Sequence, residues 1–406
     1  MADIIRPFRA THYNPSFFKN LSAFTCPPYD VISKKQLSLL KRKSPYNFSN
    51  ILIATNNDYK EIGERLRSWI DKRILVDDPA ESIFLYEQRF RIGTEKYKRF
   101  GFLSLLKMNQ KGAIFPHEYT LSAPKEDRKK VIEEVEANLS PIFVIAPKKI
   151  NYFHALHNRY CTKKPFMRFK DLDANENLVW KITDKDTIKK ICSQANGKNL
   201  VIADGHHRFE VASGYYKRNK RRFKNLNYIM SYITDAQRGL VILPTHRVIS
   251  VPDFDGALAT LKQYFDIKEV KNDNVLTGHL GKEKKFSFGV YRRSKFYFLK
   301  LKNETILDKL FPASPYKKLN TYLLHQFVLP MLKTDGSIQY THDIKEAEKL
   351  AGHDKTAFIL KPVSLSAVFD IANRGYRLPQ KSTYFYPKVY SGIAIRRFAN
   401  ANIREF

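Results

Sequence analysis

Apolar and polar residues alternate along the chain in periods that predict interleaved helices and strands. Apolar positions near helical spacing predict helices over residues 33–43, where Ser33 is a suitable N-cap, and over 58–73. Two apolar runs flank Gly93 and predict a β-hairpin across residues 83–107. The other elements expected before residue 250 are a charged helix at 124–137 and strands at 143–146, 200–203, 228–233 and 240–249.

Pro252-Asp253 marks an expected domain boundary. The alternation of helices and strands continues beyond it as a second α+β unit. The elements expected beyond it are helices at 256–265, 320–333, 344–351 and 364–375, a hairpin across 285–302, and strands at 337–340 and 357–360. The prediction is therefore an α+β protein with mixed sheets and two domains, residues 1–250 and 251–406. The first domain is expected to carry the chemistry and an inserted hairpin, and the second to close the site.

The composition narrows the class of protein. The chain has 406 residues, of which 43% are hydrophobic and 13% aromatic, so we expect a globular protein. No apolar run approaches the roughly 18 residues that span a membrane, and the N-terminus lacks the pattern of a secretory signal. The three cysteines, Cys26, Cys161 and Cys192, form no Cys-x-x-Cys pair. These features predict a cytoplasmic protein without a disulfide framework or a membrane partner.

The charge permits two interpretations. Seventy-one Lys and Arg against 40 Asp and Glu give a formal net charge of +31. Such an excess suits an anionic partner, for example nucleic acid or a phosphorylated ligand. However, the cations are spread along a chain rich in Lys, Asn, Ile, Phe and Tyr, the residues of AT-rich codons, and this compositional explanation is favoured. Nothing in the sequence indicates an oligomeric state.

Residues 200–212, Leu-Val-Ile-Ala-Asp-Gly-His-His-Arg-Phe-Glu-Val-Ala, are the most informative stretch. The apolar run predicts a short buried strand, Asp204-Gly205 a sharp turn, and the residues after it a helix. Such a turn directs backbone N–H groups and the positive end of a helix dipole at one point, where an anion can bind. Gly205 allows close approach to the backbone. His206, His207 and Arg208 add side-chain donors for phosphate oxygens.

Several common sites are excluded by missing motifs. The chain has no Gly-x-x-x-x-Gly-Lys-Ser/Thr, no Gly-x-Gly-x-x-Gly after a strand, and no Gly-x-Ser-x-Gly. His117-Glu118 does not extend to His-Glu-x-x-His, so a zinc protease is not supported. His154 and His157 are three residues apart on an expected helix without a third ligand nearby, which favours a surface or packing pair over a metal site.

Short polar clusters at the ends of the expected strands form the remaining candidates. They are Asp30; His117, Glu118 and Thr120; Lys125, Asp127 and Arg128; Asn138 and Ser140; His246 and Arg247; and the segment 381–388. Together they predict the rim of one polar pocket rich in cations, with two or three carboxylates. That composition suits phosphoryl transfer, in which positioning and charge neutralisation dominate.

These clusters, in this order, resemble a known family over nearly the whole chain. They read Cys-Pro-Pro-Tyr-Asp-Val-Ile at 26–32, Pro-His-Glu-Tyr-Thr at 116–120, Pro-Lys-Glu-Asp-Arg at 124–128, Asn-Leu-Ser-Pro-Ile at 138–142, Asp-Gly-His-His-Arg-Phe-Glu at 204–210, Leu-Pro-Thr-His-Arg at 243–247 and Lys-Ser-Thr-Tyr-Phe-Tyr-Pro-Lys at 381–388. The resemblance is to a widespread prokaryotic family catalogued as domain of unknown function "ten-fifteen".

The central motif has a second resemblance. Asp-Gly-His-His-Arg is similar to the phosphate-binding turn of the ParB/sulfiredoxin superfamily, which includes kinases of free L-serine. This resemblance implies a ParB/sulfiredoxin-like nucleotide-binding core in which Gly205, His206, His207 and Arg208 bind nucleotide phosphates. The long insertion before the motif departs from a minimal ParB domain, which leaves the identity of the general base open.

The resulting hypothesis is a small-molecule kinase that uses ATP or ADP with Mg²⁺ and acts on a hydroxyl, with free L-serine as the first candidate. Glu118 or Asp30 is expected to accept the hydroxyl proton, and Asp204 to orient the turn or hold Mg²⁺. Either Lys125 or Arg128 is expected to steady the transferred group, and His246-Arg247 to bind a substrate carboxylate. The other substrate-binding candidates are His117, Asn138, Lys381, Ser382 and Thr383.

The alternative is a non-enzymatic, ParB-like protein that binds nucleic acid or a nucleotide. The net charge of +31 supports it, and affinity that falls steeply with salt would be its mark. Against it, the chain shows neither a helix-turn-helix pattern nor a concentrated basic helix. Nucleic acid is therefore a possible partner but not the favoured one.

Overall fold

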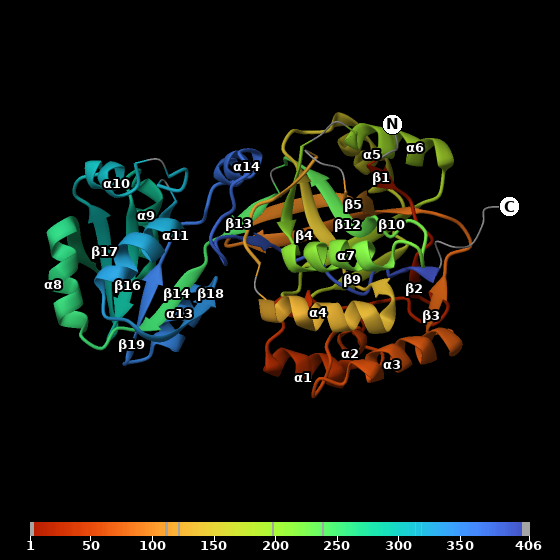
Figure 1. The fold of residues 1–406 in the computed structure, drawn as a ribbon, viewed down its shortest axis with the longest axis horizontal. Helices are drawn as coiled ribbons and strands as arrows, with labels where there is room; N and C mark the ends of the chain where they lie inside the picture. The colour runs from red at the N-terminus through yellow and green to blue at the C-terminus, as the bar shows by residue number, and fades with distance from the viewer. Residues whose placement is uncertain are drawn as a thin grey trace. The chain divides into compact units, whose positions relative to one another are not determined.

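A computed structural model describes residues 4–109, 113–120, 122–196, 199–237, 239–312, 314–317 and 319–399 (Figure 1). Contacts divide the chain into two compact units. Unit 1 contains the described parts of Met1–Pro116, Thr120–Val241 and Pro387–Phe406, and unit 2 contains His117–Tyr119 and Ile242–Tyr386. The sequence predicts two independent domains that divide at residue 250. Contact units do not show whether each part is an independent domain, so this division stays a prediction.

Unit 1 is built on a mixed sheet. Along the sheet the strands are β6 (Ile114–Pro116), β11 (Leu200–Asp204), β8 (Ile142–Ala146), β12 (Tyr228–Asp235), β5 (Glu95–Lys107), β4 (Ile83–Ile92), β10 (Glu176–Ile182) and β9 (Met167–Lys170), and β1 (Ile5–Arg6) also pairs with β5. The β6–β11 and β8–β12 pairs are parallel, and the other pairs are antiparallel. The expected hairpin is the β4–β5 pair, which turns at Gly93 with positive φ.

The helices of unit 1 follow the apolar periodicity of the sequence. They are α1 (Lys34–Lys43), α2 (Ser49–Leu52), α3 (Tyr59–Asp71), α4 (Ser122–Val135), α5 (Asn151–Tyr160), α6 (Lys185–Ala195) and α7 (His206–Asn219). Ser33 caps α1 in a capping box with Gln36, which confirms the expected N-cap. Helix α4 packs against both α3 and α7, as the orange, yellow and green helices of Figure 1 show.

Two pairs of short strands and one turn also belong to unit 1. Strand β2 (Thr11–Tyr13) pairs with β3 (Leu75–Asp77), and β7 (Ala137–Asn138) pairs with β21 (Arg396–Arg397). A single 3₁₀ turn, η1, covers Tyr29–Val31 and follows the two prolines at 27 and 28.

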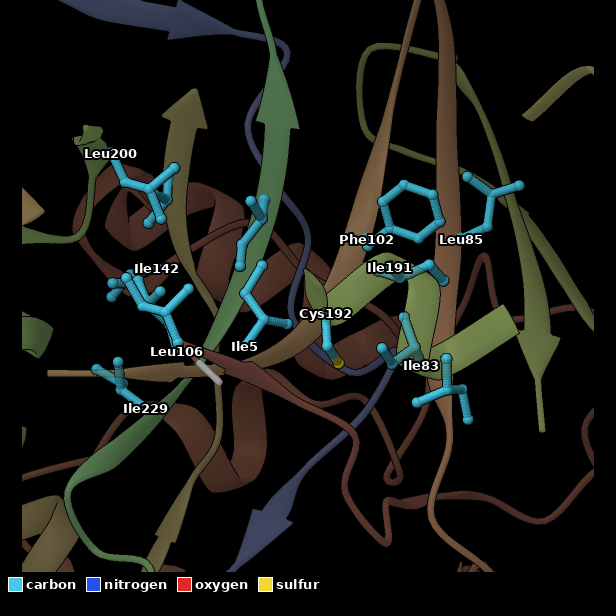
Figure 2. Packing of buried hydrophobic residues seen from close by; sticks show 14 of the residues in the cluster. Ile5, Ile83, Leu85, Phe102, Leu106, Ile142, Ile191, Cys192, Leu200 and Ile229 are labelled. Carbon is cyan, nitrogen blue, oxygen red and sulfur yellow. The ribbon is translucent and has the colours of Figure 1, made fainter. Parts of the chain in front are cut away.

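Alternate residues of the sheet form the hydrophobic core of unit 1 (Figure 2). Ile83 and Leu85 of β4 lie on the same face as Phe102 of β5, because side chains two apart on a strand point the same way. Helix α6 covers part of this face with Ile191 and Cys192. Burying a side chain of this size stabilises the fold by roughly 1.5–3 kcal/mol. Cys192 is therefore a core residue, and all three cysteines are free thiols.

The core of unit 1 also holds two histidine–carboxylate contacts. His157 of α5 contacts Glu87 of β4, and His154 contacts Asp235 of β12, with 3.0 Å between His154 Nε2 and Asp235 Oδ2. Glu87 and Asp235 are fully buried. The two histidines thus bind different carboxylates of the sheet, as a packing pair does.

Unit 2 is an antiparallel sheet with helices on both faces. Its strand order is β15 (Phe265–Val270), β17 (Lys295–Leu301), β16 (Ser287–Arg292), β19 (Lys355–Ile359), β14 (His246–Ser250) and β18 (Asp335–Thr341). Its helices are α8 (Phe254–Tyr264), α9 (Asp273–Lys282), α10 (Thr305–Leu310), α11 (Asn320–Leu323), α12 (Leu329–Met331), α13 (Ile344–Ala351) and α14 (Leu365–Asn373), with a π-helical turn, η2 (Leu324–Val328), between α11 and α12. Helix α8 and the α11–α12 segment cover one face, and α9 and α13 cover the other.

The α+β class with mixed sheets is confirmed. One predicted element is wrong in detail: the single strand expected over 240–249 is two strands, β13 (Val241–Leu243) and β14. Pro244 lies between them and has no N–H to donate to a ladder. Strand β13 pairs instead with β20 (Tyr384–Tyr386). Within the described ranges, no helix is both long and apolar enough to cross a membrane.

The buried Glu87 carboxylate predicts an acid-sensitive core. Burial raises the pKa of Glu87, but hydrogen bonds from His157 and Arg89 outweigh it and hold this pKa below the ordinary value of 4.5. Stability from this group is therefore present above about pH 4.5 and is lost as pH falls through the lowered pKa. Glu87→Gln should lower the free energy of unfolding by about 3–5 kcal/mol in urea titrations at pH 7. The exposed Glu64→Gln is the control, and an equal effect of both variants would contradict the assignment.

Candidate functional site

The expected strand, turn and helix are present at residues 200–219. Strand β11 ends at Asp204, Gly205 follows with a φ of 90°, and α7 begins at His206. A Cβ at Gly205 would meet Arg208 and Ile142 at 3.0 Å, so both the backbone conformation and the space require glycine. The first N–H groups of α7 have no acceptor within the helix and carry the positive end of its dipole. The turn has the local geometry of an anion site.

Asp204 is held between two cations. One carboxylate oxygen lies 2.9 Å from Arg208 Nη2, and the other lies 2.9 Å from Lys388 Nζ. Burial raises the pKa of Asp204, but the charges of Lys388 and Arg208 outweigh it and lower this pKa far below the ordinary range. His206, which is buried, adds to the lowering. The two cations therefore favour the ionised form of the Asp204 carboxylate.

Arg208 connects the turn to a neighbouring cavity. Its Nη1 donates to the carbonyl oxygen of Pro141 and its Nη2 to Asp204, while its buried Nε has no acceptor among the described residues. The cavity is small, with a volume of about 50 Å³. Its lining consists of Tyr29, Arg128, Asn138, Ser140 and Arg208 together with Leu52, Val131, Ile132, Ala137, Leu139, Val211 and Ile229.

Four of the sequence clusters therefore meet at this cavity. Tyr29 belongs to the Cys-Pro-Pro-Tyr-Asp cluster, Arg128 to Pro-Lys-Glu-Asp-Arg, Asn138 to Asn-Leu-Ser-Pro-Ile and Arg208 to the central motif. All four residues lie in unit 1. The polar side chains and the apolar walls together make a cavity that can hold a ligand with both kinds of surface.

Tyr29 and Arg128 form one wall of the cavity. The Arg128 guanidinium carbon lies 4.0 Å from the centroid of the Tyr29 ring. Arg128 Nη1 donates to the Leu52 carbonyl at 2.9 Å and Nε to Asp127 at 2.7 Å. Burial, followed by the charge of Asp30, raises the pKa of Tyr29. Asp30 itself is exposed, in η1, and directly follows Tyr29 of the cavity lining.

Lys125 lies beside the second turn of α7. Its Nζ is 3.2 Å from Glu210 Oε2, and the same oxygen accepts a hydrogen bond of 2.7 Å from the Thr120 hydroxyl. Glu210 thus joins two of the sequence clusters to the helix that carries the turn. His207, also on α7, is half-buried.

The other candidates come together in unit 2. His117 Nε2 lies 3.0 Å from Thr383 Oγ1, and Glu118 Oε1 accepts a hydrogen bond of 3.1 Å from the Lys381 N–H. Arg247 Nη2 donates to the Lys381 carbonyl at 3.0 Å. The backbone of Lys381 is therefore held on both sides, by Glu118 and by Arg247. Ser382 is buried and donates to the Pro379 carbonyl at 2.6 Å.

Arg247 and His246 are buried within unit 2. Arg247 is fully buried, and besides Lys381 it donates to His325 Nε2 at 3.2 Å and to the Thr245 carbonyl. Burial lowers the pKa of Arg247 to about 10, and it lowers the pKa of both His246 and His325 to about 4. The two histidines are neutral at pH 7. In this structure Arg247 therefore fixes the backbone of the Lys381 segment through its hydrogen bond to the Lys381 carbonyl.

The structure thus gathers the predicted residues into two groups, one in each unit. Unit 1 holds Asp30, Lys125, Arg128, Asn138 and the turn 204–208, and unit 2 holds His117, Glu118, His246, Arg247 and residues 381–383. The single pocket expected from the sequence, with both groups on its rim, stays a prediction.

A family model connects this chain with known sequences. The model described as "Protein of unknown function (DUF1015)" matches residues 5–322. The chain belongs to the DUF1015 family. The match confirms the family resemblance and spans six of the seven clusters, all but the one at 381–388. None of the curated proteins compared with the chain matches it.

Solved structures similar to this DUF1015 protein include a free serine kinase in complex with AMP, at 14% identity and a TM-score of 0.37, covering 70% of this chain and 86% of that chain. SbnI from Staphylococcus aureus, with a C-terminal truncation, is 9% identical with a TM-score of 0.40 over 75% of this chain and 90% of its own. A conserved hypothetical protein from Pyrococcus furiosus is 13% identical with a TM-score of 0.36, covering 72% and 95%. TM-scores of this size carry no argument about chemistry, so the site is interpreted from its own residues.

The sequence predicts no role for Tyr29 or Glu210, and it places Asp127 and Lys388 in candidate clusters without assigning either of them a role. Lys388 stands in the last cluster, Lys-Ser-Thr-Tyr-Phe-Tyr-Pro-Lys, whose first three residues were selected. The prolines before Tyr29 and before Lys388 were the available signals, because both fix the backbone ahead of a polar side chain. Neither proline indicates which residue its neighbour contacts. Lys388, for example, contacts Asp204, which lies 184 positions away in the sequence.

The geometry of the turn does not test the expectation that Asp204 binds Mg²⁺. Among the residues that the structure describes, no three His, Cys, Asp or Glu side chains are grouped so that they could hold a metal. Mg²⁺ commonly takes one or two carboxylates and completes its shell with phosphates and water. Both oxygens of Asp204 already face cations, so an ion here would have to displace Lys388 or Arg208. Magnesium binding stays a prediction.

The conformation of Gly205 predicts a graded effect of alanine substitution. Gly205→Ala should lower the free energy of unfolding by about 2 kcal/mol or more, because it adds close contacts to the strain of a positive φ. Gly93→Ala has a φ of 58° and no atom near the added Cβ, so we expect a loss of about 1 kcal/mol. Urea unfolding of both variants measures the difference. Equal losses would show that the turn at Gly205 is not crowded.

The neutral histidines of unit 2 predict a second, milder pH dependence. The unfolded chain takes up protons on His246 and His325 near the ordinary pKa of 6.5, whereas the folded protein does so near 4. The free energy of unfolding should therefore fall as pH is lowered from about 6.5 to about 4, by at most about 1.4 kcal/mol per pH unit for each histidine. In urea titrations His246→Gln should flatten this dependence, and the exposed His353→Gln should leave it unchanged.

Proposed function

We propose that this DUF1015 protein is a phosphotransferase that moves a phosphoryl group from ATP or ADP to the hydroxyl of a small molecule. The observation that carries the proposal is the turn at Asp204-Gly205, where a helix N-terminus, Arg208 and Lys388 surround one carboxylate. Such a site neutralises phosphate oxygens without a P-loop. Free L-serine is the first acceptor to test, because the Asp-Gly-His-His-Arg motif resembles that of free-serine kinases.

The roles follow from where each side chain lies. Gly205, His206, His207 and Arg208 bind the phosphates, and the ionised Asp204 orients the turn or takes part in binding Mg²⁺. Lys125, fixed by Glu210, and Arg128 at the cavity steady the transferred group. Asn138 lines the same cavity and contacts the substrate.

The remaining residues expected from the sequence keep their roles in this proposal. Glu118 accepts the hydroxyl proton, with the exposed Asp30 of unit 1 as the other candidate. His117, Lys381, Ser382 and Thr383 bind the acceptor, and His246 is the remaining candidate at its carboxylate. Because Arg247 is fully buried and bonded to the Lys381 carbonyl, its contribution is to hold residue 381 in place.

A coupled turnover assay tests the proposal. Purified protein with Mg²⁺ receives ATP, ADP or pyrophosphate against a panel of hydroxyl compounds led by L-serine. Donor consumption should match the appearance of a phosphorylated acceptor, and Arg208→Ala should reduce turnover by about 10²-fold or more, as the loss of one charge-stabilising donor does. Arg218→Ala, at the exposed end of the same helix, is the matched control. Glu118→Gln and Asp30→Asn compared in the same assay identify the base.

The absence of turnover with every donor would contradict the proposal. If the protein then bound DNA or RNA with an affinity falling steeply between 50 and 200 mM salt, the ParB-like binding protein would replace it, consistent with the net charge of +31.

A further inference from the structure

We propose that Lys388 is a phosphate-binding residue which Asp204 holds in place until an anion arrives. The inference rests on the proposed function and extends it to a residue from the far end of the chain. Lys388 is also the point at which the last segment of unit 1 reaches the turn.

The balance of charge at the turn is the first observation. Asp204 faces two cations directly, Arg208 and Lys388, each at 2.9 Å. A third, Arg99, is fully buried, and Asp204 is among the groups whose charge acts on it. One carboxylate therefore serves more than one positive charge in a region shielded from water. An excess of buried positive charge beside a helix N-terminus is suited to an anion of charge −2 or more, such as a terminal phosphate.

The placement of Lys388 is the second observation. Its carbonyl accepts a hydrogen bond of 3.0 Å from Gln88, and the carbonyl of Pro387 accepts one of 2.5 Å from Arg99. Both donors are fully buried on β4 and β5. The backbone on which Lys388 stands is thus fixed to the central sheet, and its side chain is only 9% exposed. A surface lysine has no such support, so the position of this ammonium group is specified by the fold.

The third observation is an unused donor in the same place. Arg208 Nε is buried and has no acceptor among the described residues, although Arg208 already binds Asp204 and Pro141. Buried N–H groups normally find an acceptor, so this one indicates a missing acceptor at the turn. A phosphate bound at the turn would supply an acceptor for Arg208 Nε. The lysine stem rotates freely enough to exchange a carboxylate oxygen for a phosphate oxygen.

A purely structural ion pair is the competing explanation, and unit 1 contains one for comparison. Lys181 pairs with Asp78, which also accepts from His12 Nε2 at 2.9 Å. Asp78 likewise serves two basic side chains, but it does not adjoin the α7 turn or line the cavity. Lys181→Gln is therefore the matched control for Lys388→Gln.

Calorimetric titration with pyrophosphate, tripolyphosphate and ADP, in EDTA, tests the inference. Lys388→Gln should weaken binding of all three probes by 10-fold or more, and Lys388→Arg should keep most of the affinity because it keeps the charge. Lys181→Gln should bind like the wild type. Asp204→Asn should bind the phosphate probes more tightly than the wild type, because the carboxylate that competes for Lys388 is gone. Because removing the carboxylate also removes its repulsion of any nearby anion, the gain supports Lys388 only if it disappears in the double variant Asp204→Asn/Lys388→Gln.

The outcomes separate this inference from the proposed function. Wild-type affinity for the probes in Lys388→Gln would overturn the role of Lys388 and leave the kinase proposal standing. Weaker binding in Asp204→Asn would overturn the competition between the carboxylate and the phosphate. No binding of any probe by the wild type would overturn both proposals. If Lys388→Gln fails to fold, Lys388→Arg and Asp204→Asn decide the question.

Discussion

The ionised carboxylate of Asp204 is the constraint on which the functional part of unit 1 depends. It joins the end of β11, the first turn of α7 through Arg208, and the last segment of the chain through Lys388. A buried carboxylate is tolerated only with partners of opposite charge, so these three parts of the chain must meet for the fold to be stable. The same requirement concentrates cations at a helix N-terminus, where a phosphate can use them. The same charged side chains therefore stabilise the fold and, in our proposal, bind the phosphate.

Residues of the polar sequence clusters hold one another in place, so they have a structural role as well as a proposed chemical one. Tyr29 packs on Arg128, which in turn is fixed by Asp127 and the Leu52 carbonyl. In unit 2 the Lys381 backbone is held by Glu118 and Arg247. These candidate site residues are thus supported by a second polar residue that restricts their rotation. Such support is what a site for a small charged substrate requires, because a mobile side chain loses most of its electrostatic effect.

Charge inside the two units follows different rules. The core of unit 1 pairs histidines with carboxylates, as His157 with Glu87 and His154 with Asp235 show. In unit 2, His246 and His325 are neutral, and Arg247 donates to neutral acceptors. The sequence placed these histidines on helices or strands correctly but did not identify their partners. The partners lie on other strands, and no local pattern specifies which strands become neighbours.

The sequence by itself determined the local structure: the capping box of Ser33 and Gln36, the hairpin that turns at Gly93, and the strand, turn and helix around Gly205. Periodicity, capping and the backbone preferences of glycine act over a few residues, so they can be read in order along the chain. Only the tertiary structure decided that Lys388 meets Asp204, that four clusters line one cavity, and that Pro244 separates β13 from β14 into different sheets. These outcomes depend on which distant segments bury charge and apolar surface together, and that choice is made by the packing of the whole chain.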